Sequence, residues 1–334
     1  MERIYVINLD RKADRWRGIQ AELRRMKGAN GRPLSDVTRR YSAVDARYLD
    51  LPANPDLIDP TYTLAEQLFV QPDTKIGTDA ETLARTVTMS RQEVAVALSH
   101  IGVWQRVAEG DADHTLVLED DGFFARSFGR DMSAAWAEVV ASTPIKLEPA
   151  GSSAPYAQPG SPFDLLYVSC KQVRDACLDQ GTMQHVFVPR AGLWQLSGYV
   201  LSKPGAQRLL ASLRVRGPVD MWINHQFDGL QVLATRRSIV GQRRAASVPG
   251  VDQTSSVTRT VSGARTGART PPTSVSAPRH RLDHREDRIR RRPLSMIAAI
   301  PAPDTGDRTG DLWTELQVRR FRTTARSCRA GRVP

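Results

Sequence analysis

The sequence predicts an α/β protein built on a mostly parallel central sheet, and three observations lead to this prediction. The chain opens with a strand–turn–helix unit, which is half of a β-α-β unit. Further along, a second buried strand ends directly in three carboxylates, and a capped amphipathic helix precedes that strand. The 334 residues are enough for one large domain or two average ones.

The opening unit spans residues 4–28. Residues 4–9 form a short apolar run rich in β-branched side chains, which is typical of a strand. A polar turn over residues 10–15 follows, and Gly28 comes just after a set of apolar residues at helical spacing: Trp16, Ile19, Leu23 and Met26. Residues 41–45 are predicted to form the next short strand.

The middle of the chain contains the predicted helix and the second strand. Residues 50–90 are rich in Pro, Asp and Thr without a sustained period, and we expect a long surface insertion there. A capping box at residues 90–93 predicts the start of a helix. Its apolar face is formed by Val94, Ala97, Leu98, Ile101, Trp104 and Ala108. Residues 115–118 form a compact buried strand that leads into residues 119–121.

The next part of the chain alternates between further strands and a helix. Residues 144–162 are rich in Pro, Gly and Ser and predict a loop. Strands are predicted over residues 163–168, 199–201 and 230–233. Pro204 suits the first turn of a helix that carries Leu209, Leu210 and Leu213.

The net charge of +11 is confined to the end of the chain. Residues 1–240 carry equal numbers of basic and acidic side chains, whereas residues 241–334 carry 19 arginines, no lysine and 8 acidic residues. We therefore expect residues 243–334 to form a largely disordered basic tail, because it cannot bury enough apolar surface to offset its ordering entropy. A uniformly basic nucleic-acid-binding domain is disfavoured. Translation of a shifted reading frame is an alternative explanation of this composition.

Several protein classes lack support in the sequence. There is no apolar run long enough for a transmembrane helix and no signal-peptide core, so we expect a cytosolic chain. Cys170, Cys177 and Cys328 are too few and too irregular for a disulfide framework; buried free thiols are favoured over a Cys170–Cys177 pair. P-loop, dinucleotide-binding and zinc-site spacings are absent from the sequence.

Glu119, Asp120 and Asp121 are the strongest chemical signal. They follow a buried strand, and ligands of α/β proteins bind where such strands end. Adjacent like charges repel one another unless a cation or solvent relieves them, and a divalent ion takes oxygen ligands. The sequence therefore predicts a metal and diphosphate site, with a solvated acidic turn as the alternative.

A second cluster is a candidate on weaker grounds. Asn8, Asp10, Arg11 and Arg15 lie where the first strand ends and its helix begins, a place suited to a nucleotide or phosphate. A solvated basic stripe is the alternative for the two arginines.

Three other residues have a structural and a chemical interpretation. Glu93 caps its helix. His100 follows Ser99 directly, so this serine and histidine cannot form a nucleophile–base pair on a helix, and a structural role near the apolar helix face is favoured for His100. Asp220 is either a general base or a helix cap.

Taken in order, these motifs resemble glycosyltransferase family 25, which includes bacterial lipopolysaccharide and lipooligosaccharide galactosyltransferases and the collagen galactosyltransferases. The resemblance covers residues 1 to about 242. It rests on five segments: residues 6–15 (VINLDRKADR), 43–45 (AVD), 92–100 (QEVAVALSH), 118–121 (LEDD) and 218–220 (PVD). The departures are Gln92, Ala95 and Val96 in place of two glycines and a cysteine, and Gln195-Leu196 in place of Gly-Thr.

The resemblance implies a GT-A-like nucleotide-sugar-binding fold over residues 1–242. It implies an inverting transfer of a hexose from UDP-galactose or a related UDP-sugar to a lipid-linked or lipooligosaccharide glycan, with Mn²⁺ or Mg²⁺ as cofactor. Asp121 and Asp120 would hold the metal and the diphosphate. The nucleotide side would comprise Asn8, Asp10, Arg11, Arg15 and Glu119, and the catalytic candidates are Asp220, Glu93 and His100.

Other readings of the sequence stay open. A cytoplasmic enzyme could contact anionic membrane, such as the inner face of the inner membrane, through the arginine-rich tail. A catalytically degenerate family member acting as a scaffold is the main alternative. A nucleic-acid binder that uses the tail is the weaker one, since the tail lacks interleaved aromatic residues for stacking.

Overall fold

A computed structural model describes residues 2–73, 75–142, 161–172, 183–189 and 192–243 of the chain. The loop predicted over 144–162 lies outside these residues except for its last two. The predicted basic tail lies outside them except for Arg243. Cys177 and Cys328 are also outside, and Cys170 is a free thiol.

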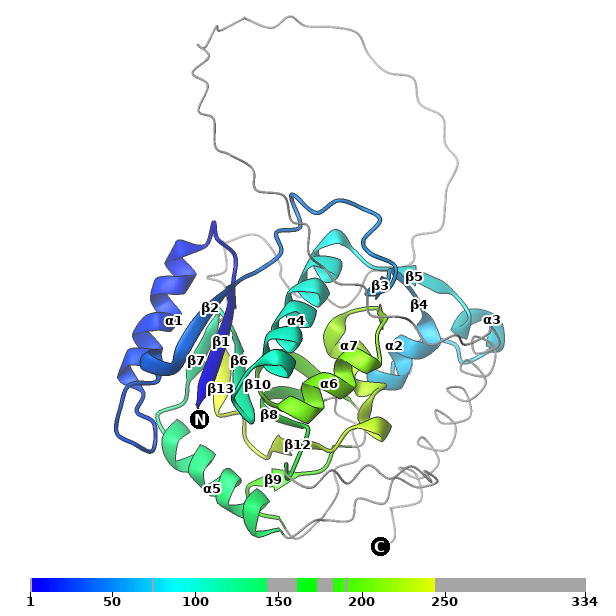
Figure 1. Cartoon of the computed structure of the whole chain (residues 1–334). Coiled ribbons are helices and arrows are strands. Elements are labelled where there is room, and N and C mark those ends of the chain that lie inside the picture. The colour runs from blue at the N-terminus through cyan, green and yellow to red at the C-terminus, as the bar shows by residue number, and fades with distance from the viewer. Residues whose placement is uncertain (1, 74, 143–160, 173–182, 190–191, 244–334) are drawn as a thin grey trace, which may run out of the picture. The chain divides into compact units, whose positions relative to one another are not determined.

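Within the described residues, the architecture is a mixed sheet of seven strands (Figure 1). In spatial order these are β2 (Thr38–Ser42), β1 (Arg3–Asn8), β6 (His114–Glu119), β10 (Leu193–Ser202), β8 (Leu165–Gln172), β12 (Val232–Thr235) and β9 (Val186–Phe187). Strands β2, β1 and β6 run parallel, as do β8 and β12. Strand β10 is antiparallel to both of its neighbours, and β9 is antiparallel to β12. The sheet is therefore α/β as expected but less parallel than predicted.

The physical reason lies in the burial of β10. Almost every residue of this central strand is buried, so apolar and polar residues do not alternate along it. Such alternation is typical of antiparallel strands that have one solvent-facing side, and without it nothing in the sequence of β10 indicates its direction. The predicted strand at 199–201 is the last part of this longer strand.

Alternating side chains of the strands divide the core into two clusters, one on each face of the sheet. Ile4 and Val6 of β1 point to the face covered by α1 (Ala13–Arg25) and α5 (Phe128–Ala141). Ile7 points to the opposite face, which is covered by α4 (Arg91–Glu109), α6 (Lys203–Ala211) and α7 (Val219–Asn224) (Figure 1). The period of two in the strands thus produces a three-layer arrangement.

Helix α4 confirms the predicted capping box. The Ser90 hydroxyl accepts a hydrogen bond from the Glu93 amide at 3.3 Å, and the Glu93 carboxylate accepts one from the Ser90 amide at 2.6 Å. The helix is 19 residues long and buries Val94, Ile101 and Trp104 against the sheet. No helix in the described part of the chain is both long and apolar enough to cross a membrane.

The segment from 50 to 90 is more structured than the predicted surface insertion. It contains β3 (Ile58–Asp59), β4 (Thr61–Thr63), α2 (Leu64–Val70), α3 (Ala80–Leu83) and β5 (Thr86–Thr88). Ile58, Tyr62, Val70 and Met89 are buried in the same cluster as α4, so this part of the prediction is corrected. These elements are too short to show a helical or strand period in the sequence. The prediction therefore depended on the Pro, Asp and Thr content alone.

The remaining elements are short, apart from the unpredicted helix α5. They are two 3₁₀ turns, η1 (Leu34–Val37) and η2 (Phe227–Gly229), and the strands β7 (Gly122–Phe124), β11 (Val215–Arg216) and β13 (Val240–Gln242). Strand β13 pairs with β7, which brings residues 240–242 beside the turn that follows β6. The strand predicted at 41–45 is β2, which ends at Ser42, so residues 43–46 form a loop instead.

Candidate active site

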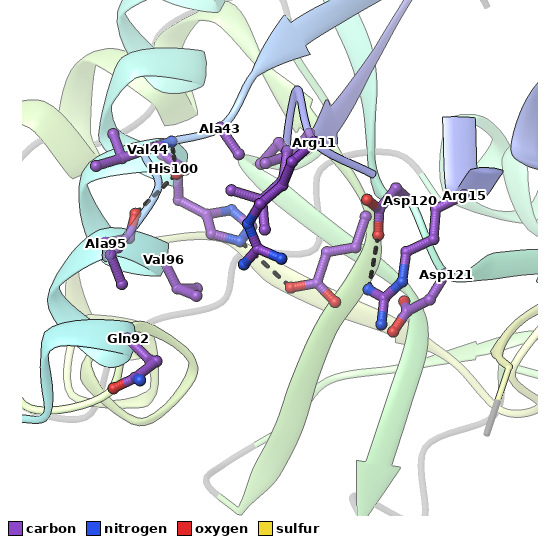
Figure 2. Close-up of a pocket in the computed structure, with 15 residues that line it drawn as sticks. Arg11, Arg15, Ala43, Val44, Gln92, Ala95, Val96, His100, Asp120 and Asp121 are labelled. Atoms are coloured by element: carbon purple, nitrogen blue, oxygen red, sulfur yellow. Dashed lines mark hydrogen bonds and ion pairs between the residues drawn. The ribbon is translucent and has the colours of Figure 1, made fainter. Parts of the chain in front are cut away.

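The candidate site lies at the edge of the sheet where the parallel strands β1 and β6 end. Ile7 of β1 is paired with Glu119 of β6, so the segments that follow both strands emerge side by side. A cavity of about 260 Å³ opens there, bounded by the start of α1, the 43–46 loop and α4. Six predicted site residues line it: Arg11, Arg15, His100, Glu119, Asp120 and Asp121 (Figure 2).

Asp120 is buried and fully engaged with side chains from the first β-α unit. Its Oδ2 accepts a hydrogen bond of 2.7 Å from Asn8 Nδ2, and its Oδ1 accepts one of 3.1 Å from Arg15 Nη1. Asn8 Oδ1 in turn accepts a hydrogen bond of 2.7 Å from Arg40 Nε. Figure 2 shows Arg15 reaching across to Asp120 with Asp121 close by. The arginine and the amide therefore offset the carboxylate's burial cost.

Asp121 differs from Asp120 because one of its oxygens is buried without a partner. Its Oδ2 accepts a hydrogen bond of 3.0 Å from Gln242 Nε2, whereas Oδ1 has no hydrogen-bond partner among the described residues. Burial, helped by repulsion from Glu119 and Asp120, raises the pKa of Asp121 to about 6. Of the two aspartates, Asp121 is therefore the one with an oxygen available to accept a proton or to contact a cation.

Glu119 belongs to a buried polar network on the α4 side of the cavity. Its Oε2 accepts a hydrogen bond of 3.0 Å from Ser197 Oγ, and its Oε1 lies 3.7 Å from His100 Nε2. His100 Nδ1 lies 3.0 Å from the Tyr199 hydroxyl, which also accepts a hydrogen bond from Trp104 Nε1 at 2.9 Å. Burial acts to raise the pKa of Glu119, but the contacts with His100 and Ser197 outweigh it and leave the pKa lowered.

The loop formed by residues 43–46 is hydrogen-bonded to α4 through Ser99. The Ser99 hydroxyl accepts a hydrogen bond from the Val44 amide at 2.9 Å and donates one to the Ala95 carbonyl at 2.7 Å. On the same loop, Asp45 accepts hydrogen bonds from Arg47 and from Arg11, at 2.8 Å in the latter case. These bonds, with Arg47 contributing most, hold the pKa of Asp45 well below its usual range. The loop therefore sets the direction of Arg11 beside the cavity.

Comparison with known proteins identifies the family. The family model described as glycosyltransferase family 25 (LPS biosynthesis protein) matches residues 1–223. The chain belongs to glycosyltransferase family 25. It is 32% identical over 145 residues to a cattle (Bos taurus) protein named "Probable inactive glycosyltransferase 25 family member 3". It is 30% identical over 145 residues to a mouse (Mus musculus) protein named "Inactive glycosyltransferase 25 family member 3". Each alignment covers 42% of this chain and only 21% of the relative.

Sequence segments that carry the family resemblance, although far apart in the chain, lie around the same cavity. The 6–15 segment supplies Arg11 and Arg15, the 43–45 segment supplies the loop, and the 92–100 segment supplies Ser99 and His100. Three of the five sequence motifs thus converge on the carboxylates that end β6 (Figure 2).

Four of the predicted site residues do not line the cavity. Asn8 is only 1% exposed and holds Asp120 in place. The Asp10 side chain is 72% exposed and pairs with Arg40 at 2.8 Å, while Glu93 caps α4. Asp220 lies in the first turn of α7, where its carboxylate accepts hydrogen bonds from the amides of Gln195 and Met221. Burial raises the pKa of Asp220 to about 6, with a contribution from Glu119.

Gln195 and Gln242 are two site residues that the sequence interpretation missed. Gln195 Nε2 donates a hydrogen bond of 3.2 Å to Gln242 Oε1, so the chain of contacts runs from Asp220 through both glutamines to Asp121. Gln195 also has a left-handed backbone with φ of 76°. It stands where the family pattern has Gly-Thr, and a glycine there would adopt this conformation without strain. The replacement of this glycine is the feature of the sequence that could have indicated Gln195 as a site residue.

A metal ion would find few protein ligands here. The described residues contain no group of three or more His, Cys, Asp and Glu side chains placed to hold one. The unpartnered Asp121 Oδ1 nevertheless fits a cation that takes most of its ligands from a substrate diphosphate and water, as Mg²⁺ commonly does. Asp120 fits less well than Asp121, because both of its oxygens are already hydrogen-bonded.

Proposed function

We propose that this family 25 chain is an active glycosyltransferase that moves a hexose from a UDP-sugar to a glycan acceptor. The observation that carries the proposal is the cavity itself, which joins two arginines to three carboxylates and leaves Asp121 Oδ1 without a partner. A cavity with cationic side chains at one place and acceptor oxygens at another suits a ligand that has both phosphates and hydroxyl groups.

Arg11 and Arg15 would bind the donor diphosphate. Both side chains are partly exposed and line the cavity, and their guanidinium groups match phosphate oxygens in geometry and charge. Asp121 would hold Mn²⁺ or Mg²⁺, which supplies charge neutralisation at the departing UDP when bound. Arg15 lies against Asp120 and would stay there, so that this carboxylate does not repel the diphosphate.

Asp220 is the proposed general base that takes the proton of the acceptor hydroxyl. Its pKa of about 6 allows the carboxylate to be ionised at neutral pH while remaining a better base than an ordinary aspartate. Glu93 is a poorer candidate because its carboxylate is occupied by the α4 cap, and His100 is a poorer one because its ring nitrogens lie near the Tyr199 hydroxyl and the Glu119 carboxylate. The transfer would proceed with inversion through an oxocarbenium-like state.

The acceptor and the cellular setting are part of the same proposal. The acceptor would be a lipid-linked or lipooligosaccharide glycan, as the description of the matched family (LPS biosynthesis protein) suggests. The enzyme would then work in the cytoplasm, with the arginine-rich residues 243–334 attracting it to anionic membrane.

A catalytically degenerate member is the second candidate. The names of the two relatives, both called inactive, favour it. It predicts that donor binding is weak or that a bound donor is never turned over.

Donor titration with purified full-length protein distinguishes these candidates. UDP-galactose, UDP-glucose and UDP-N-acetylglucosamine would be titrated by calorimetry with Mn²⁺ or with EDTA, and UDP release would be followed with glycan acceptors. We expect Mn²⁺-dependent binding that Asp121→Ala abolishes and that Asp111→Ala preserves, since the Asp111 side chain is 85% exposed and remote from the cavity lining.

Each outcome of this titration has one meaning. Binding followed by UDP release supports the active enzyme, whereas binding without any release supports the degenerate member. Folded protein that binds none of the three donors refutes the proposal.

A further inference from the structure

His100 has an unpartnered polar atom in an otherwise satisfied environment. The residue is only 1% exposed, yet its Nε2 is buried without a hydrogen-bond partner in the described part of the chain, and the residue lines the cavity. A buried donor or acceptor left unpaired costs free energy, so an atom of this kind at a cavity wall indicates a contact that a ligand completes.

The neighbours of His100 determine which ring nitrogen carries the proton. The indole Nε1 of Trp104 can only donate, so the Tyr199 oxygen must accept from it. The phenol is fully buried, and the acceptor that the structure places within reach of its own proton is His100 Nδ1, at 3.0 Å. Nδ1 is therefore the acceptor, and the neutral imidazole carries its proton on Nε2.

The protonated Nε2 points toward Glu119, but the two groups are too far apart to bond directly. Nε2 and Glu119 Oε1 are separated by 3.7 Å, the pair drawn as the dashed line from His100 in Figure 2. This exceeds the range of an N–H···O hydrogen bond. The other Glu119 oxygen is already held by Ser197. A donor N–H and an acceptor oxygen thus lie side by side on two residues that line the cavity.

This pair discriminates between ligand groups by chemistry. A hydroxyl can accept from Nε2–H and donate to Oε1 at the same time. A phosphate oxygen can only accept, and the Glu119 carboxylate repels it. The arginines of the cavity provide the opposite preference, since Arg11 and Arg15 attract anions.

We propose that His100 and Glu119 form a hydroxyl clamp that binds one hydroxyl group of the donor's hexose, and that Tyr199 and Trp104 are positioning residues which set its polarity. The inference rests on the proposed function and deepens it, because it orients the nucleotide sugar in the cavity. The sugar lies at the α4 side against His100, and the diphosphate lies at the α1 side against Arg15.

The first test needs no ligand. Nitrogen-15 correlation spectra of the histidine-labelled full chain, recorded at a pH high enough to keep imidazoles neutral, report which nitrogen of His100 bears the proton. We expect the Nε2–H form in the wild type and a loss of that preference in Tyr199→Phe. A wild-type ring protonated on Nδ1 overturns the clamp.

The second test compares UDP-hexose with UDP. His100→Phe removes the Nε2 donor, and we expect it to weaken UDP-hexose binding about tenfold while leaving UDP binding unchanged. His100→Gln places an amide N–H near the Nε2 position and should recover part of the loss. Among monodeoxy-hexose donors, the one that lacks the clamped hydroxyl should bind wild type and His100→Phe equally.

The failures of the two proposals are distinguishable. If UDP-hexose binds the wild type but His100→Phe keeps the same preference for it over UDP, the clamp is refuted and the proposed function stands. If the wild type binds neither UDP nor a UDP-hexose, both are refuted.

Discussion

Asn8 holds the acidic motif in place, and its replacement by alanine is the sharpest test of that role. The side chain is 1% exposed and connects the end of β1 to the turn after β6. Asn8→Ala removes the 2.7 Å hydrogen bond to Asp120 Oδ2, the 2.7 Å bond accepted from Arg40, and the 3.2 Å bond donated to the Lys12 carbonyl. Asp120 then keeps only Arg15 as a side-chain partner.

The expected loss of stability follows from the charge and exposure of these partners. A hydrogen bond to an ionised group contributes about 1.5–3 kcal/mol, and the Asp120 carboxylate is too buried to replace it with water. The Arg40 side chain is 33% exposed and can be rehydrated, so its lost bond adds only about 0.5 kcal/mol. We expect Asn8→Ala to lower the unfolding free energy by about 2–4 kcal/mol.

Urea unfolding followed by fluorescence measures this loss. With a slope of about 3 kcal/mol per molar urea, the midpoint should fall by about 1 M. Asn54→Ala is the matched control, because Asn54 is exposed and its side chain only accepts a local hydrogen bond from the Asp56 amide. We expect that variant to lose no more than about 0.5–1 kcal/mol. If Asn8→Ala costs no more than Asn54→Ala, Asn8 does not hold the motif.

Three further predictions test packing, strain and charge. Gly205→Ala should lower the unfolding free energy by about 2 kcal/mol in urea titrations, because its Cβ would clash with the Asp164 carbonyl oxygen. At Gly129 an added Cβ would meet no atom of the described residues within 4 Å, so Gly129→Ala should instead raise the unfolding free energy by about 0.5–1 kcal/mol; equal effects would contradict the packing. Gln195→Gly should be about 1 kcal/mol more stable than Gln195→Ala, since only glycine relieves the left-handed φ of 76°; a more stable alanine variant would argue against strain there. Asp220 has a folded-state pKa of about 6, above its value in the unfolded chain, so the folded chain binds the extra proton and stability falls as pH rises from about 4 to about 6. Asp121 contributes a fall of the same sign, so the stability of Asp220→Asn in thermal unfolding should still fall across this range, but by an amount on the order of 2 kcal/mol less than the wild type. Identical profiles for variant and wild type would refute the raised pKa of Asp220.

The sequence by itself identified the elements whose evidence is local. The β-branched run of β1, the apolar run of β6 and the Ser90–Glu93 capping box each depend on residues close together in the chain. The family motifs were also readable, and the resemblance that they carry assigns Arg11, Arg15 and the three carboxylates to the donor site. In the structure, the parallel neighbours β1 and β6 bring their carboxyl ends to the same edge, so residues more than a hundred positions apart meet there.

Only the tertiary structure decided which contacts each side chain of the site makes. Asp120 and Asp121 are adjacent and chemically identical in the sequence, yet Asp120 is hydrogen-bonded by Asn8 and paired with Arg15, whereas one oxygen of Asp121 has no partner among the described residues. The same is true of His100, whose Nδ1 lies 3.0 Å from the hydroxyl of Tyr199, a residue 99 positions further along the chain. The physical reason is that such contacts depend on strand direction, register and the docking of helices onto the sheet. Local periodicity determines which face of an element is buried, but the atoms that meet across that face are decided only when the elements pack.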